Sequence, residues 1–316
     1  MKKAALLCAS GIGDGLLMMI GAHHLKVAGY IPTIFHNAAK DLSLLFESDT
    51  FIPHVPLEDL EDTLNQYDRV IVENDNSKRA WYLFRLREKG KLKHVTFFFP
   101  TDSKNMKEGD FLFDPKIPVA TNLSLACQKL LGTPVTKEND LTLPQDKVFK
   151  KYPKRIIIHP TSNDPKRNWK QKQFLSLAKK LEKEGFSVDF CVSPSERKDW
   201  EEIEGISLPT FKSLKEIKDH IYESGFLIGN DSGLGHLASN LGIPTLTVSG
   251  NPKRVRLWRP DWAPGKVVTI PFPLPNFKGI NFRIRENFWQ NFVPISRVYQ
   301  TFIELTNELC NLGIDS

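Results

Sequence analysis

The 316-residue sequence lacks the signatures of several common enzyme classes. It has no G-x-x-x-x-G-K-[ST] motif, so P-loop phosphoryl transfer is unsupported, and no H-E-x-x-H motif that would indicate a zinc peptidase. No two aspartates have D-x-D spacing, which disfavours a transferase that holds a divalent metal through such a pair. We therefore expect no metal site and no cofactor.

Cysteine is scarce and widely spaced. No C-x-x-C pair is present, so neither a zinc cluster nor a disulfide framework is indicated, and a reducing compartment is the simpler interpretation. The four cysteines are Cys8, Cys127, Cys191 and Cys310.

Long hydrophobic runs are also missing. No segment approaches the roughly 18 apolar residues that indicate a membrane span. The start, Lys2-Lys3 followed by AALLCAS, resembles a secretory signal, but Gly11 and Asp14 interrupt it at once. We interpret it as a first buried strand and expect a cytoplasmic protein that can lie on the inner membrane surface.

The composition is that of a globular protein, with 41% hydrophobic and 25% charged residues. The length suits two α/β domains of about 150 residues each. The net charge of +6 suits an anionic ligand, an acidic lipid surface or nucleic acid, without choosing among them.

Apolar runs alternate with helical patterns in both halves, which predicts doubly wound parallel sheets. Strands are expected at 4–10, 30–36, 68–74 and 94–100, and again at 155–160, 186–193, 226–231 and 245–250. The Pro- and Lys-rich stretch 141–155 is the predicted linker. We expect domains at 1–148 and 149–292, and a terminal helix in 293–316 that packs back on the first domain. The segment 251–292 has no clear assignment.

The first chemical motif is SGIGDGL (10–16), directly after the first strand. Its glycines allow backbone amides to approach a ligand. Leu16 occupies the position where the dinucleotide fingerprint G-x-G-x-x-G needs glycine. Asp14 has two interpretations: an N-cap that stabilises the next helix by about 1 kcal/mol, or a carboxylate that a reacting hydroxyl can reach.

The most specific stretch is NDSGLGHLASNLGIP (230–244), a strand end followed by a Ser/Gly turn and a helix start. The amides at this helix start form a natural seat for a phosphate or pyrophosphate, and they belong to Ser232, Gly233, Leu234 and Gly235. Asp231 would repel a phosphate, so it either receives sugar hydroxyls or fixes the loop. His236 either contacts a phosphate oxygen or packs between helix and sheet.

Two further segments carry basic residues. In HPTSNDPKRNWKQKQF (159–174), Lys166 and Arg167 can neutralise a departing diphosphate, and Thr161 and Ser162 can donate hydrogen bonds. A solvated basic loop is the alternative.

In SKRAWYLFRLREKGKLK (77–93), the basic residues either bind an anionic acceptor or form a solvated helix face. The candidates are Lys78, Arg79, Arg85 and Arg87. No nucleic-acid-binding motif accompanies them.

These motifs, in this order, resemble glycosyltransferase family 9, the lipopolysaccharide heptosyltransferases. The resemblance covers roughly residues 4–260 and is strongest at 211–250, where the D-S-G-x-x-H-L-A core lies. It implies a B-type glycosyltransferase fold, in which two Rossmann-like domains face a cleft. It also implies a metal-independent, inverting transfer of heptose from ADP-heptose to a lipopolysaccharide-core glycolipid.

The resemblance also assigns roles to individual residues. Asp14 matches the general base, with Gly13 beside it in the acceptor site. The core residues Asp231, Ser232, Gly233 and His236 match the site of the donor diphosphate and sugar. The family lysine of K-x-W falls on Arg167, with Lys166 one position further away, so either can serve the phosphate. A glutamate that contacts the donor ribose falls near Glu196.

Two other classes remain open at this stage. An NAD-dependent dehydrogenase would also be doubly wound, but Leu16 breaks its fingerprint. A non-catalytic relative that binds sugar nucleotides would keep the fold, although Asp14 and the complete D-S-G-x-x-H core argue against it.

Overall fold

The computed structural model describes residues 1–101, 104–271 and 288–313. The chain forms two compact units, Met1–Leu143 and Pro144–Ser316. The boundary lies inside the Pro- and Lys-rich stretch 141–155. Of the unassigned segment 251–292, residues 272–287 lie outside the described part.

Unit 1 is built on a six-stranded parallel sheet in the order β3-β2-β1-β4-β5-β6. Its strands are β1 (Lys2–Leu7), β2 (Tyr30–Phe35), β3 (Thr50–Ile52), β4 (Arg69–Glu73), β5 (Val95–Phe99) and β6 (Phe111–Leu112). Its helices are α1 (Ile12–Val27), α2 (Ala39–Ser43), α3 (Leu60–Leu64), α4 (Lys78–Glu88) and α5 (Val119–Leu131).

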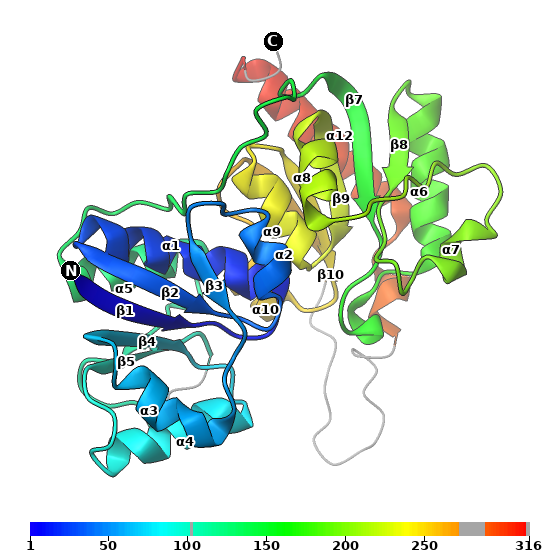
Figure 1. Cartoon of the computed structure of the whole chain (residues 1–316). Helices are drawn as coiled ribbons and strands as arrows, with labels where there is room; N and C mark the ends of the chain where they lie inside the picture. Colours follow the sequence, from blue (N-terminus) through cyan, green and yellow to red (C-terminus); the bar gives the residue numbers. More distant parts are fainter. Residues whose placement is uncertain (102–103, 272–287, 314–316) are drawn as a thin grey trace. The chain divides into compact units, whose positions relative to one another are not determined.

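Helices cover both faces of this sheet (Figure 1). On one face α1 packs against β1 and α5. On the other face, α3 and α4 bury Leu60, Leu64 and Phe84 in one core cluster with β1, β4 and β5. The strand order reverses between β1 and β4, and such switch points are where open α/β sheets bind ligands.

Unit 2 has a five-stranded parallel sheet in the order β11-β10-β9-β7-β8. Its strands are β7 (Tyr152–His159), β8 (Ser187–Phe190), β9 (Ser224–Asn230), β10 (Thr245–Ser249) and β11 (Gly265–Thr269). Its helices are α6 (Gln171–Lys183), α7 (Lys198–Glu201), α8 (Leu214–Tyr222), α9 (Gly233–Asn240), α10 (Pro252–Trp258) and α12 (Ile295–Asn311). The switch point of this sheet lies between β7 and β9. The prediction of two doubly wound α/β domains is confirmed.

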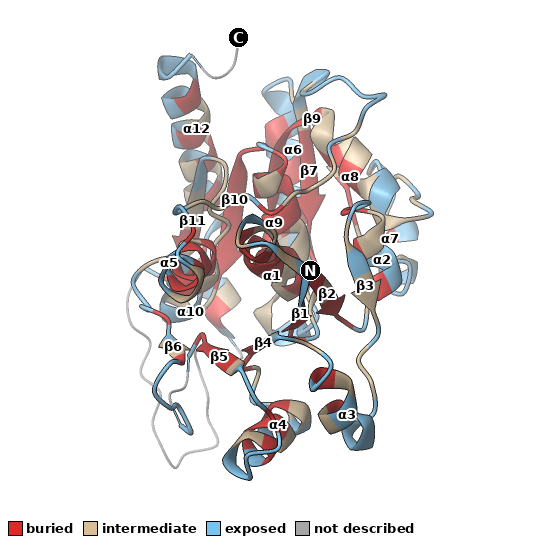
Figure 2. Ribbon diagram, turned by 60° about the vertical axis from the view of Figure 1, so that its left-hand side comes forward, coloured by how far each residue is buried: buried red, intermediate tan, exposed pale blue. Residues whose placement is uncertain are grey.

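The terminal helix α12 packs on α6 and β11 of unit 2. The expectation that it packs back on the first domain stays a prediction. Its apolar face, with Val298, Phe302, Leu305 and Leu309, is buried in the core of that unit. Figure 2 shows this helix with buried residues along one face and exposed residues along another. The apolar stripe of a helix predicts burial but does not say against which partner.

Helix α5 was not predicted, and its buried face explains why. It places Asn122 and Ser124 among the apolar residues, which interrupts the hydrophobic pattern. Asn122 is satisfied locally: its amide nitrogen donates to the carbonyls of Asp114 and Ile117, and its oxygen accepts from the Asp114 amide at 2.8 Å. A polar residue that bonds locally, as Asn122 does, is therefore compatible with a buried helix face.

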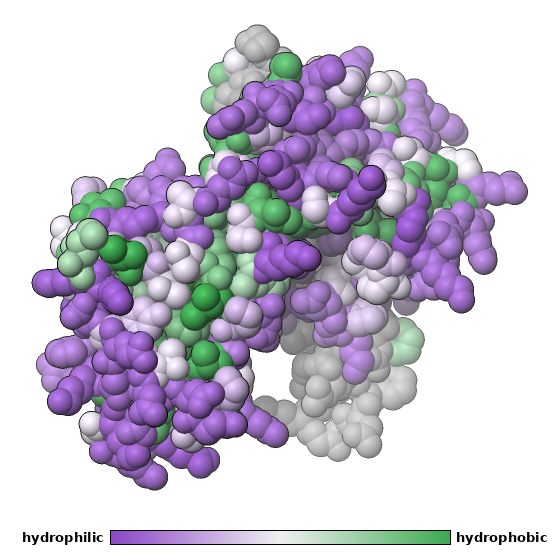
Figure 3. All heavy atoms as spheres, viewed as in Figure 1, coloured by the Kyte–Doolittle hydropathy of each residue, from purple (hydrophilic) through white to green (hydrophobic). Residues whose placement is uncertain are grey.

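On the face shown in Figure 3, hydrophilic residues dominate and hydrophobic ones occur in small groups. Within the described ranges, no helix has both the length and the apolar character needed to cross a bilayer.

Candidate active site

In unit 1 the candidate site lies on the glycine loop, residues 8–11, which joins β1 to α1. Gly11 is the residue at the N-cap, and Asp14 is the third residue of the helix. The Asp14 carboxylate accepts the Gly11 amide hydrogen, with 3.0 Å between Oδ2 and N. Asp14 therefore supports the helix start as the second half of a capping box and is not its N-cap, which was one of the two interpretations from the sequence.

Side chains from four other elements hold the backbone of the glycine loop. Glu73, at the end of β4, accepts the Ala9 amide hydrogen at 2.8 Å. Carbonyl oxygens of the loop accept the remaining bonds, which come from residues after β2, after β3 and in α4. The donors are His36 to Gly11 (3.1 Å), His54 to Cys8 (3.1 Å) and Arg79 to Cys8 (3.4 Å).

Burial sets the ionisation of this cluster. It raises the pKa of Glu73 well above its usual value, and the nearby Asp14 charge adds to the effect. Burial also raises the pKa of the Cys8 thiol. The pKa of His54 is lowered to about 4, first by burial and then by Arg79. His54 is therefore neutral near pH 7, and burial disfavours the charged form of Glu73.

The hydrogen bonds of His36 and His54 define the tautomer of each neutral ring. Each uses Nε2–H towards a carbonyl, so Nδ1 is an acceptor. Nδ1 of His36 accepts the Ala38 amide at 2.9 Å. Nδ1 of His54 is buried and has no hydrogen-bond partner within the described ranges. That unsatisfied acceptor lies beside the glycine loop, because the other ring nitrogen of His54 bonds the Cys8 carbonyl.

Of the basic residues predicted on 77–93, the structure brings one to the glycine loop. Arg79 is largely buried and lies 3.7 Å from Asp75. Arg87 instead pairs with Asp110 at 2.7 Å and fixes the β5–β6 connection. Lys78 and Arg85 are exposed on α4. The sequence analysis did not identify Glu73, His36 and His54. Each is a polar residue at or just after the end of a strand, and that position could have indicated them.

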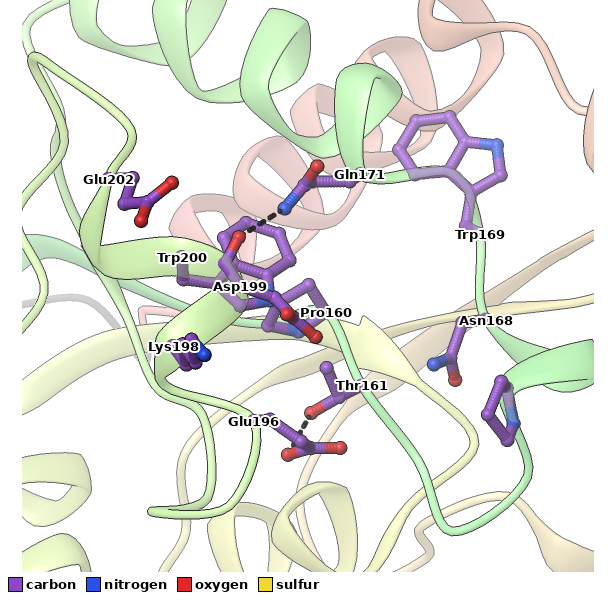
Figure 4. Close-up of a pocket in the computed structure, with 11 residues that line it drawn as sticks. Pro160, Thr161, Asn168, Trp169, Gln171, Glu196, Lys198, Asp199, Trp200 and Glu202 are labelled. Atoms are coloured by element: carbon purple, nitrogen blue, oxygen red, sulfur yellow. Dashed lines mark hydrogen bonds between the residues drawn. The ribbon is translucent and has the colours of Figure 1, made fainter.

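In unit 2, Thr161 and Glu196 lie in contact at the end of β7. The Thr161 hydroxyl donates to Glu196 at 3.0 Å. They line a pocket of about 640 Å³ with Asn168, Lys198 and Trp200 (Figure 4). Glu196 also accepts bonds from the amide and hydroxyl of Ser193, at 3.1 and 2.6 Å, and all these bonds go to Oε2. Oε1 makes no hydrogen bond with the described residues.

The rest of the loop after β7 is held from within. Ser162 donates its hydroxyl to Asn168 at 2.7 Å, so it shapes the loop and does not line the pocket. Trp169 is a buried anchor whose indole nitrogen donates to the Val293 carbonyl at 3.0 Å. Lys166 is exposed, whereas Arg167 is half-buried and reaches Asp231, with 3.8 Å between the charged atoms.

Asp231 is buried at the end of β9 and is paired with arginines from two elements. Besides Arg167, it binds Arg254 of α10, whose Nε lies 2.9 Å from the Asp231 carboxylate. These ion pairs tie the loop after β9 to two other segments of unit 2, and the expectation that Asp231 receives sugar hydroxyls stays a prediction. Arg254 was missed because the segment after β10 was left unassigned. Arg254 follows β10, just as the two predicted loops follow β7 and β9 of the same sheet, and this position could have indicated it.

The start of α9 holds two unsatisfied buried atoms. Ser232 is the N-cap residue, yet its hydroxyl caps nothing and has no partner among the residues described. His236 is 4% exposed and its Nδ1 is also without a described partner. Burial lowers the pKa of His236 to about 4, and its other ring nitrogen bonds the Trp258 backbone. His236 is thus packed in the interior and still offers a free acceptor beside a helix N-terminus.

Metal ligands are not grouped in the described ranges, where no cluster of three or more His, Cys, Asp or Glu side chains could hold an ion. Leu16, which breaks the dinucleotide fingerprint, is fully buried in α1. It therefore serves the core of unit 1 at the position where a nucleotide-binding glycine would be needed.

The fold matches solved glycosyltransferases along nearly its whole length. The E. coli ADP-heptose lipopolysaccharide heptosyltransferase II is 18% identical, with a TM-score of 0.68 over 98% of this chain and 99% of that one. A glycosyltransferase family 9 protein from Veillonella parvula is 16% identical, with a TM-score of 0.71 over 97% and 98%. The E. coli heptosyltransferase WaaC with ADP is 15% identical, with a TM-score of 0.66 over 96% and 99%.

A fourth matched structure is that of an iron-containing protein. The iron-containing dodecameric glycosyltransferase TibC from E. coli is 13% identical, with a TM-score of 0.59 over 98% of this chain and 76% of that one. No curated protein sequence matches the chain significantly. The model of glycosyltransferase family 9 (heptosyltransferase) matches residues 63–268, about two thirds of the sequence, and includes the D-S-G-x-x-H core. The chain therefore belongs to glycosyltransferase family 9, the heptosyltransferase family, and is a glycosyltransferase.

Proposed function

We propose that the chain transfers heptose from ADP-heptose to a lipopolysaccharide-core glycolipid by an inverting, metal-independent displacement. The observation that carries the donor assignment is the pair of unsatisfied buried atoms, Ser232 Oγ and His236 Nδ1, at the start of α9. Buried polar atoms without partners are costly, and a bound ligand removes that cost. The matched structures include WaaC with ADP and with ADP-2-deoxy-2-fluoro heptose.

The start of α9 would bind the donor diphosphate. The amides of Gly233, Leu234 and Gly235 are in the first turn, where they lack intrahelical partners and the helix dipole favours negative charge. Ser232 would donate its hydroxyl to the diphosphate, and His236 Nδ1 would accept from a sugar hydroxyl. Arg167 and Arg254, held at this place by Asp231, would neutralise the charge that develops as the diphosphate leaves.

The pocket that Thr161 and Glu196 line at the end of β7 would hold the nucleoside. Glu196 is the candidate for the ribose because its Oε1 remains available while Thr161 and Ser193 fix Oε2. A carboxylate oxygen accepts hydroxyl hydrogens well. Ser162 would act through the loop that it holds. In this proposal unit 2 is the donor domain.

Unit 1 would be the acceptor domain. Asp14 would take the proton of the acceptor hydroxyl while that oxygen attacks the anomeric carbon opposite the departing diphosphate. Gly13 would lie against the acceptor, and Arg79 would bind its anionic groups together with the exposed Lys78 and Arg85. An acceptor carried by a glycolipid would bring the protein to the surface of the inner membrane.

Calorimetric titration with ADP, UDP and GDP, each with and without EDTA, tests the donor assignment. We expect selective binding of ADP that EDTA leaves unchanged. Ser232→Ala should weaken ADP binding about 10- to 100-fold, the effect of losing a hydrogen bond to a charged group. Ser176→Ala is the matched control, because Ser176 is exposed on α6 and donates only to the Lys172 carbonyl. Preference for UDP or GDP would mean that the donor is a sugar nucleotide other than ADP-heptose. Loss of binding in EDTA would overturn metal independence.

Gly11→Ala tests the acceptor side without altering the carboxylate. Gly11 has φ −81° and ψ 145°, which any residue adopts, but an added Cβ would lie 2.7 Å from Asp14 Oδ2. The carboxylate must move, so we expect kcat to fall at least about tenfold. The control is Gly21→Ala in the same helix, where the nearest atom would lie at 3.5 Å. Equal kcat values for the two variants would show that the Asp14 orientation is unimportant.

A further inference from the structure

Two carboxyl groups hold one loop at the switch point of unit 1. Glu73 Oε2 accepts the Ala9 amide at 2.8 Å, and Asp14 Oδ2 accepts the Gly11 amide at 3.0 Å. The two amides are separated by a single residue, while the carboxyls come from β4 and α1. A displacement of Glu73 would therefore move the backbone that orients Asp14.

Glu73 is buried without a cation of its own. It is 6% exposed, and no ion pair joins it to any residue in the described ranges. The charged and titratable groups that face it are Cys8, Asp14, Asp75 and Arg79, and β5 places Phe98 opposite it in the sheet. Arg79 is nearest to Asp75, at 3.7 Å, so its charge is already shared.

A buried carboxyl in such a place holds its proton, because an unpaired charge in the interior is costly. Burial, and then the Asp14 charge, raise the pKa of Glu73 by more than the Ala9 amide and Arg79 lower it, which agrees with this argument. When two carboxyls interact, they titrate as a pair, and the more buried one retains the proton.

We propose that Glu73 is a positioning residue for Asp14: as a neutral acid it fixes the glycine loop and holds the proton of the carboxyl pair, leaving Asp14 ionised as the base. The inference rests on the base role proposed for Asp14. At rest the pair carries one proton, on Glu73. During transfer the acceptor O–H proton passes to Asp14 as the new C–O bond forms and the bond to the diphosphate breaks. One proton then leaves to water, and the resting state returns.

The test compares Glu73→Leu and Glu73→Gln with the unchanged enzyme. Leucine removes the acceptor for the Ala9 amide, so kcat should fall at least tenfold while the Kd for ADP stays the same. Glutamine is neutral and keeps a carbonyl oxygen, so it should restore much of the lost kcat. The pH profile supplies the readout that a merely structural role would not move. The unchanged enzyme should lose kcat/KM for the anionic acceptor at alkaline pH, when Glu73 ionises, and Glu73→Gln should lack that limb.

Infrared difference spectroscopy tests the proton directly. At pH 7 the unchanged enzyme should show a C=O stretching band of a protonated carboxyl that Glu73→Gln loses and Asp14→Asn keeps. If the leucine variant does not fold, the infrared band and the pH profile of Glu73→Gln still test the inference. Identical pH profiles, or no such band, would overturn the inference. An active Asp14→Asn variant would instead overturn the base role proposed for Asp14, and an unchanged enzyme that does not transfer heptose would overturn the proposed function, so these failures are distinguishable.

Discussion

Replacing Asp14 with asparagine should lower the kcat of transfer by about 10²- to 10⁴-fold, the usual contribution of a general base. Asparagine keeps the size of the side chain and an oxygen that can accept the Gly11 amide, so the helix start should persist. What it loses is the capacity to take the acceptor proton. Because the proposed donor site lies in unit 2, the Kd for ADP should not change.

Two measurements separate lost chemistry from lost structure. The free energy of unfolding should change by no more than about 1 kcal/mol, the scale of a helix-cap contribution. Asp41→Asn is the matched control, because Asp41 is an exposed carboxylate in the first turn of α2. It should leave kcat unaltered. Turnover by Asp14→Asn close to that of the control would remove Asp14 from the mechanism.

Arg167→Ala should lower kcat/KM by about 10²- to 10³-fold, the range observed when one group that stabilises transition-state charge is removed. Lys166→Ala should have a much smaller effect. The sequence left these neighbours equivalent, and the structure distinguishes them by position. Arg167 is half-buried beside Asp231, whereas the Lys166 side chain is exposed. The Lys166 carbonyl accepts the indole N–H of Trp289, a bond that the alanine variant retains.

A double-mutant cycle with Arg254→Ala tests whether the two arginines act together. Both contact Asp231, so we expect the loss in the double variant to differ from the sum of the single losses. Steady-state kinetics with saturating acceptor and varied donor would measure each term. A larger loss for Lys166→Ala than for Arg167→Ala would reverse the assignment.

The sequence alone was sufficient for the fold class and for the two motif-bearing loops. Continuous apolar runs such as Ile156–Ile158 are typical of parallel strands covered on both faces, and these three residues are fully buried. The D-S-G-x-x-H core follows such a strand, so its place at the carboxyl end of β9 was predictable. Local pattern also placed Asp14 at the start of this helix, with the N-cap as one interpretation, whereas the structure makes it the third residue of α1.

Short elements and the destination of α12 were beyond local pattern. Strands β3 and β6 have three and two residues, too few to show a periodicity. The stripe on α12 required a hydrophobic partner, and only the packed structure identified α6 and β11 as that partner.

The tertiary structure alone decided which polar residues act together. Glu73 and Ala9 are 64 positions apart, and they meet because β4 pairs with β1 across the switch point. Arg254 meets Asp231 because β10 lies beside β9. Periodicity reports which residues are buried along one segment, whereas strand order determines which segment ends become neighbours. The sequence thus determined the elements and two of the site's loops, and the sheet order determined the charges around them.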